Sequence, residues 1–161
     1  IGLITIETVV VSGLIAMYFY LKLNNPAWPP DGIEPPSLTL PLINTLILLA
    51  SGVAMRIADQ GGRNEKRSQL LIGQAVALTL AEVFLALTWA ESRGSDCHWS
   101  TPAYGPGTYA ITIFHAGHVI SVVLKGLVVF AMAYRGMFTR KRRLALEVNG
   151  LYWQFVVIIW L

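Results

Sequence analysis

The sequence predicts an all-α membrane protein, a single bundle of five transmembrane helices with its N-terminus inside and its C-terminus outside. Composition is the first observation: 55% of the 161 residues are hydrophobic and only 13% are charged, which is unlike a soluble domain. The second is a series of long apolar segments, since crossing about 30 Å of hydrocarbon takes about 20 helical residues. These segments lack the polar alternation of barrel strands and are too long for them.

Five apolar segments follow one another, separated by polar or proline-rich connections. The predicted spans are residues 2–23, 38–57, 69–91, 107–134 and 147–161. The first ends before NNPAWPPDGIEPP, whose five prolines cannot continue a helix. Pro41 is compatible with the second span because it lies in the opening turns. The polar stretch DQGGRNEKRS then separates the second span from the third.

The last three spans are bounded in the same way. The third ends near Glu91, before a polar stretch that contains Cys97 and His98. The fourth follows a glycine- and proline-containing turn and ends near Tyr134, before a basic connection. The fifth begins near Glu147 and stays apolar to the last residue. We therefore expect one transmembrane domain over the whole chain.

Basic residues in the connections predict the orientation, because lysine and arginine concentrate on the cytoplasmic side. The connections after the second and fourth spans hold Arg56, Arg63, Lys66, Arg67, Arg135, Arg140, Lys141, Arg142 and Arg143. The other two connections have only Lys22 and Arg93 at their edges. The net charge of +3 does not predict nucleic-acid binding, because a basic cluster beside a span is the usual topology signal and attracts phospholipid headgroups.

Five ionisable residues lie inside the spans: Glu7, Glu82, His115, His118 and Lys125. Each is costly at the bilayer centre unless it is paired or faces protein. At 1.5 Å of rise per residue, Glu7 and Lys125 lie about 24 and 27 Å below the outer surface, and Glu82 and His118 about 14 and 16 Å. Matched depth therefore predicts two pairs, Glu7 with Lys125 and Glu82 with His118, as structural or proton-related contacts.

The two histidines share a face, since positions three apart are neighbours on a helix. Haem ligation needs imidazoles that converge from opposite helices, which one face cannot supply. A metal site would need a carboxylate or further nitrogen ligands at the same depth, and Glu82 could contribute; a proton relay would use the same glutamate. The remaining interpretation is interhelical hydrogen bonding that locks the bundle. Cys97 is the single cysteine, so it forms no intrachain disulfide, and with His98 it lacks the ligand count of a zinc site.

Six motifs occur in one order along the chain: TIETVVVSGLIAMYFYL, WPPDGIEPPSLTLPLINTLILLASG, AEVFLALTWAE, YGPGTY, FHAGHV and LEVNGLYWQFVVIIWL. Together they resemble the cytochrome c oxidase subunit III family of haem-copper respiratory oxidases, in its five-helix bacterial form. The motif positions are Glu7, Trp28, Asn44, Thr45, Glu91, Glu147, Tyr152 and Trp153, together with the two histidines. The chain departs from the family at Thr88, Lys125, Gln154 and Val157, where glutamine, an apolar residue, histidine and aspartate are usual.

The resemblance implies a non-catalytic subunit of a cytochrome c or quinol oxidase in the bacterial cytoplasmic membrane. Such a subunit stabilises catalytic subunit I and supports proton uptake during oxygen reduction. It implies subunits I and II and phospholipids as partners, and haem and copper in those partners. No catalytic, cofactor-binding or metal-binding residue is expected in this chain. Two alternatives stay open: an accessory subunit of a nitric oxide reductase, and a small ion- or proton-translocating protein. In the second alternative Glu7, Glu82, His118 and Lys125 would line a polar path, although the internal repeats common in transporters are absent from the sequence.

Overall fold

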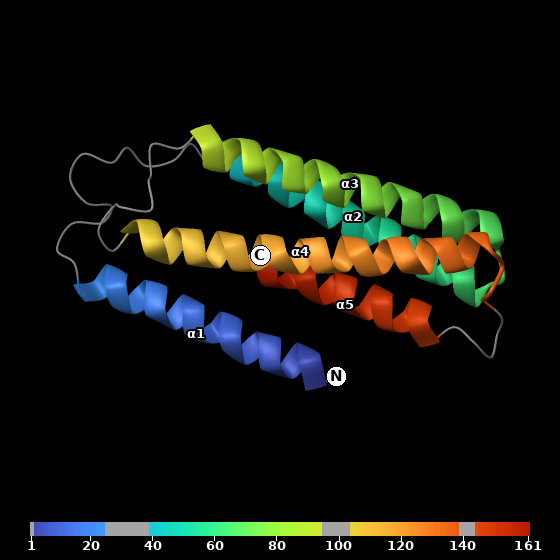
Figure 1. Cartoon of the computed structure of the whole chain (residues 1–161), viewed down its shortest axis with the longest axis horizontal. Helices are drawn as coiled ribbons and strands as arrows, with labels where there is room; N and C mark the ends of the chain where they lie inside the picture. Colours follow the sequence, from blue (N-terminus) through green and yellow to red (C-terminus); the bar gives the residue numbers. More distant parts are fainter. Residues whose placement is uncertain (1, 25–38, 95–103, 139–143) are drawn as a thin grey trace.

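Five helices make up the chain, and their order matches the predicted spans (Figure 1). The computed structural model describes residues 2–24, 39–94, 104–138 and 144–161. The helices are α1 (Gly2–Asn24), α2 (Thr39–Arg63), α3 (Arg67–Gly94), α4 (Tyr104–Tyr134) and α5 (Leu144–Trp160). These ranges contain helices and turns and no strand. The prediction of an all-α protein is therefore confirmed.

Helix length and composition suit a membrane. Helices α1 to α4 are each long and apolar enough to cross a bilayer, whereas α5 is a shorter apolar helix. A polytopic helical membrane protein, as the sequence predicts, is the fold that results. The apolar surface supports this assignment, because Leu23, Ile72 and Leu144 are each at least 65% exposed. Apolar side chains of this kind suit contact with lipid.

The turn between α2 and α3 differs from the prediction. Helix α2 continues to Arg63, past the predicted end at residue 57, and α3 begins at Arg67 instead of residue 69. Backbone hydrogen bonds from Asn64 to Gln60 (3.0 Å) and from Lys66 to Gly61 (2.9 Å) close the turn, and Glu65 adopts a φ of 58° to reverse the chain. The apolar pattern marks where lipid ends, whereas helical hydrogen bonding continues into the interface.

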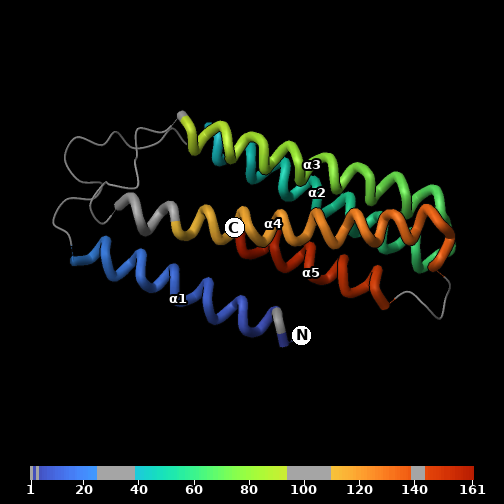
Figure 2. The backbone as a smooth tube through the Cα atoms, viewed as in Figure 1, coloured from blue at the N-terminus to red at the C-terminus, as the bar shows by residue number. Residues whose placement is uncertain are grey.

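Four helices form a closed ring, and the fifth lies outside it. Helix α2 packs along α3, α3 on α4, α4 on α5, and α5 back on α2. Helix α1 contacts only α4 and, less extensively, α5, and Figure 2 shows it at the edge of the bundle. None of the side chains in its spanning segment is fully buried. The polar contacts between α1 and the ring therefore matter for its position.

Buried side chains from the four ring helices meet at the centre of the bundle. The largest fully buried ones are Trp153, Phe84, Leu48, Met55 and Leu146. Glycines let the helices approach closely: a Cβ at Gly73 would lie 2.9 Å from the backbone nitrogen of Ala58 and 3.0 Å from the carbonyl oxygen of Ala54. Both contacts are with the backbone of α2, which cannot move aside as a flexible side chain would.

Because of this close contact, adding one methyl group at Gly73 should push α3 away from α2. We expect Gly73→Ala to lower the free energy of unfolding by about 1–3 kcal/mol, because the added Cβ overpacks the α2–α3 interface. Thermal unfolding of the purified protein in detergent micelles, followed by tryptophan fluorescence, measures it. Gly117→Ala is the matched control, since a Cβ there meets nothing within 4 Å. Equal effects of the two substitutions would contradict the close approach.

Candidate functional site

A polar cluster joins α1, α4 and α5 inside the spanning region. The Tyr152 hydroxyl donates to Glu7 Oε1 at 3.0 Å, and His118 Nε2 lies 3.4 Å from the same oxygen. The Glu7 and His118 side chains are each 14% exposed. Glu7 is therefore the point at which the peripheral helix α1 is attached to the ring.

The hydrogen bonds of His118 fix its protonation pattern. Its Nδ1 lies 2.7 Å from the carbonyl oxygen of Phe114, and a carbonyl only accepts, so Nδ1 carries a proton. Nε2 then faces the Glu7 carboxyl group, and this contact is attractive only when one further proton lies between the two groups. The pair is either an imidazolium with a carboxylate or an imidazole with a carboxylic acid. Both ring nitrogens of His118 therefore face oxygen atoms of the protein.

Lys125 completes the cluster from a different direction. Its Nζ lies 3.8 Å from the centroid of the Tyr152 ring, the ring whose hydroxyl contacts Glu7. This is a cation–π contact, which is attractive because the ring face is electron-rich. The predicted direct pair of Glu7 with Lys125 is wrong: both residues contact Tyr152, and the ion pair of Glu7 is with His118.

The second predicted pair, Glu82 with His118, is also wrong. Glu82 is exposed on the outer surface of α3, while His118 contacts Glu7. Counted from the observed helix ends, Glu7, Glu82 and His118 lie about 25, 18 and 21 Å deep. These depths are too similar to select partners. The direction in which each side chain leaves its helix decides the pairing, and that depends on how the helices are rotated in the bundle.

His115 has different surroundings from His118, although the two are three residues apart. It is buried at 5% exposure and packs on Phe84 and Trp160, with ring centroids 5.8 and 4.7 Å away. Within the part of the chain that the structure describes, neither ring nitrogen has a hydrogen-bond partner. Packing in an aromatic cluster therefore accounts for His115, and the two histidines do not face a common partner.

Several motif positions link helices through hydrogen bonds. Asn44 Nδ2 donates to Thr88 Oγ1 at 3.5 Å, joining α2 to α3. Trp160 Nε1 donates to Thr45 Oγ1 at 2.9 Å, joining α5 to α2. Thr88 replaces the usual glutamine, and its shorter side chain still serves as the acceptor for Asn44. These contacts are of the kind that the interhelical hydrogen-bonding interpretation predicts for the buried polar groups.

Trp153 makes the most buried of these links. Its Nε1 donates to Ser51 Oγ at 3.2 Å, and the side chain is 1% exposed. Glu91 is half-buried near the end of α3, and Glu147 is half-buried in the first turn of α5, where a negative charge suits the helix dipole. Trp28 lies outside the described residues, as do Cys97 and His98.

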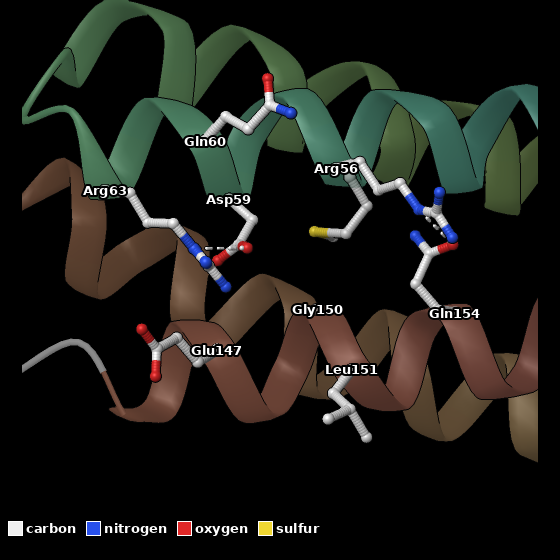
Figure 3. A pocket seen from close by; sticks show the side chains of 9 residues that line it. Arg56, Asp59, Gln60, Arg63, Glu147, Gly150, Leu151 and Gln154 are labelled. Carbon is white, nitrogen blue, oxygen red and sulfur yellow. Dashed lines mark hydrogen bonds and ion pairs between the residues drawn. The ribbon is translucent and has the colours of Figure 1, made fainter.

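A polar cavity between α2 and α5, with a volume of about 480 Å³, was not predicted from the sequence (Figure 3). Arg56 Nε donates to Gln154 Oε1 at 3.1 Å, and Gln154 Nε2 donates to the Gly52 carbonyl at 2.7 Å. Arg63 pairs with Asp59 at 3.1 Å. Arg56 and Gln154 lie on different helices, so their hydrogen bond could not be predicted from sequence spacing and is seen only in the tertiary structure. Gln154, where the chain departs from the family pattern, thus makes polar contacts with α2.

A second cavity, of about 640 Å³, lies beside the polar cluster between α4, α5 and the start of α1. Its walls are mostly apolar, with Lys125 and Tyr152 at one side and Asn149 in the lining. Asn149 is 4% exposed, and neither polar atom of its side chain has a partner among the described residues. In the same residues, no three histidine, cysteine, aspartate or glutamate side chains gather as metal ligands would.

Comparisons with known proteins place these contacts in a family context. Residues 3–161 match the family described as Cytochrome c oxidase subunit III. The chain is 36% identical over 135 residues to Cytochrome c oxidase subunit 3 of Pyricularia grisea, covering 83% of this chain and 50% of the relative. The proteins of that name from Syncerus caffer and Myxine glutinosa are 34% and 33% identical over 83% of this chain and 52% of their own length. The chain thus spans about half the length of these relatives.

Proposed function

Because this chain belongs to the cytochrome c oxidase subunit III family, we propose that it is a non-catalytic subunit of a haem-copper terminal oxidase in aerobic respiration. The observation that carries the proposal is the meeting of three motif segments at one place. Glu7, His118 and Tyr152 come from the first, fifth and sixth motifs, and their side chains form one hydrogen-bonded cluster. The match to the family and its named relatives favours this proposal over a nitric oxide reductase subunit or an ion-translocating protein.

In this proposal the chain supports its partners instead of carrying electrons. Subunits I and II would hold the haem and copper and reduce oxygen, while this chain packs beside subunit I and sustains its proton uptake. The contacts of the two histidines support that division, since His118 bonds to the Phe114 carbonyl and pairs with Glu7 and His115 packs against aromatic rings.

The proposed orientation places the α2–α3 turn on the cytoplasmic side. Arg63, Lys66 and Arg67 lie at this turn, and Arg67 Nη2 donates to the backbone carbonyl of Tyr134 at the end of α4. The α2–α3 turn and the end of α4 thus lie at the same end of the bundle (Figure 1), and the basic groups of this turn support an inward-facing end. A location in a bacterial cytoplasmic membrane stays a prediction that rests on the five-helix resemblance.

Phospholipids are the small-molecule partners that we propose. The cavity of about 640 Å³ has apolar walls from three helices, which suit an acyl chain. Val128, Met132 and Leu151 contribute to these walls. A lipid there would also cover the Lys125 stem, which lies along apolar surface while its ammonium group rests on Tyr152.

Gentle extraction tests the proposed function. We expect a tagged form of this chain, solubilised in a mild detergent, to purify with a haem-bearing complex that consumes oxygen. The chain separated from that complex should show no haem absorption of its own. Removing the chain should leave initial oxygen reduction intact and shorten the time for which the enzyme stays active during turnover. Extraction of the chain from its membrane in a mild detergent without any haem-bearing partner would overturn the proposal.

A further inference from the structure

A single acidic side chain stands on the outer surface of α3 in the middle of its span. Glu82 is exposed, and it lies 15 residues after Arg67 and 11 before Arg93, the two arginines that bound the apolar segment. These separations correspond to about 22 and 16 Å along the helix axis. The carboxyl group is therefore near the centre of a hydrocarbon layer of about 30 Å. A carboxylate is strongly disfavoured there when it faces lipid.

Nothing else in the described part of this chain compensates Glu82. Three basic groups of the helices have other partners: Lys125 lies on the Tyr152 ring, and Arg93 lies over the Trp89 ring at 4.9 Å. Arg56 donates to Gln154 of α5. The glutamate inside the span of α1, Glu7, has two partners within the chain. Glu82 differs from it in needing a partner from outside.

The residues around Glu82 would allow a second helix to come close. Thr79, Glu82 and Ala86 fall within about 60° of one another around the helix axis, at 100° per residue, and all three are exposed. Thr79 donates its hydroxyl to the Ala75 carbonyl at 3.0 Å, so it does not satisfy the carboxylate. Small residues on either side of an acid permit the short interhelical distance that a hydrogen bond across helices requires.

We propose that this face of α3 docks against a transmembrane helix of another subunit of the oxidase, which presents a basic or hydrogen-bond-donating side chain to Glu82 at mid-membrane depth. The inference rests on the proposed function for the identity of the complex. Charge decides the kind of partner. A lipid phosphate would repel the carboxylate, and a second copy in a twofold contact would bring two Glu82 carboxylates together. A donor from a different polypeptide complements it.

Photocrosslinking in the purified complex tests the docking face. A benzophenone amino acid replaces Ala86 on the proposed face, and the control replaces Leu124 on α4, which is 60% exposed. We expect the probe at position 86 to attach to another oxidase subunit and the probe at position 124 to give less than a third of that yield. Attachment of the position 86 probe only to lipid, or to a second copy of this chain, would overturn the inference.

Substitution of Glu82 gives a second, independent measurement. We expect Glu82→Leu to reduce the amount of this chain retained by the complex after detergent washing by about tenfold, which corresponds to the loss of one charge-assisted contact. Glu82→Gln should retain more than Glu82→Leu, because the amide oxygen still accepts. Helix content by circular dichroism confirms folding of both variants. Full retention of Glu82→Leu overturns this inference alone, whereas a wild-type chain without any haem-bearing partner overturns the proposed function.

Discussion

Trp153→Ala lowers the free energy of unfolding by about 3 kcal/mol, the largest loss that we expect from any single substitution in this chain. The indole is 1% exposed, and its ring lies against Gly126 of α4, where a Cβ would be 3.1 Å from Cζ3. It also donates to Ser51 of α2 at 3.2 Å. Removing the indole leaves a cavity where α2, α4 and α5 meet. Thermal unfolding in detergent micelles measures the loss.

Most of this loss comes from packing, because lipid tails are as apolar as the bundle interior and burial itself drives helix association little. The controls separate packing from hydrogen bonding. Ser51→Ala removes only the acceptor and should cost about 1–2 kcal/mol. Trp153→Phe keeps an aromatic ring and should fall between Ser51→Ala and Trp153→Ala. If Ser51→Ala were as costly as Trp153→Ala, the hydrogen bond and not the packing would dominate.

Glu7→Ala should detach α1 from the ring, with a loss of about 2–3 kcal/mol. The substitution leaves the Tyr152 hydroxyl and the His118 Nε2 without their shared acceptor. Helix α1 contacts the ring through α4 and α5, not through α2 or α3, so the Glu7 contacts are a large part of its polar attachment. Protease sensitivity of α1 in detergent, together with the unfolding transition, reports the detachment. The double variant Glu7→Leu with His118→Leu should be less destabilised than Glu7→Leu alone, because it leaves no unpaired imidazole.

Lys125→Met is the matched control for this prediction. The side chain is exposed and its ammonium group lies over the face of the Tyr152 ring, and methionine also packs on aromatic rings. We expect a loss below about 1 kcal/mol. A loss as large as that of Glu7→Ala would instead support the direct Glu7–Lys125 pair that matched depth predicts.

Much of the fold could be predicted from the sequence. Apolar segments of the right length located all five helices, because a lipid-facing helix must be apolar over its full length. Their ends were less accurate: α2 continues to Arg63 and α4 begins at Tyr104. Hydrogen-bonded turns persist in polar sequence at the interface, where composition no longer marks the helix. The ionisable residues inside the spans could also be named, since they stand out against an apolar background.

The sequence by itself determined which polar groups enter the membrane and at about what depth, through helical rise alone. Only the tertiary structure decided their partners. Glu7, Glu82 and His118 lie within about 7 Å of one another in depth, yet rotation of the helices turns Glu7 toward His118 and Tyr152 and turns Glu82 outward. One helix's sequence fixes the angle between its own side chains. The direction in which that set points depends on packing against the other helices, such as the close approach of Gly73 to α2.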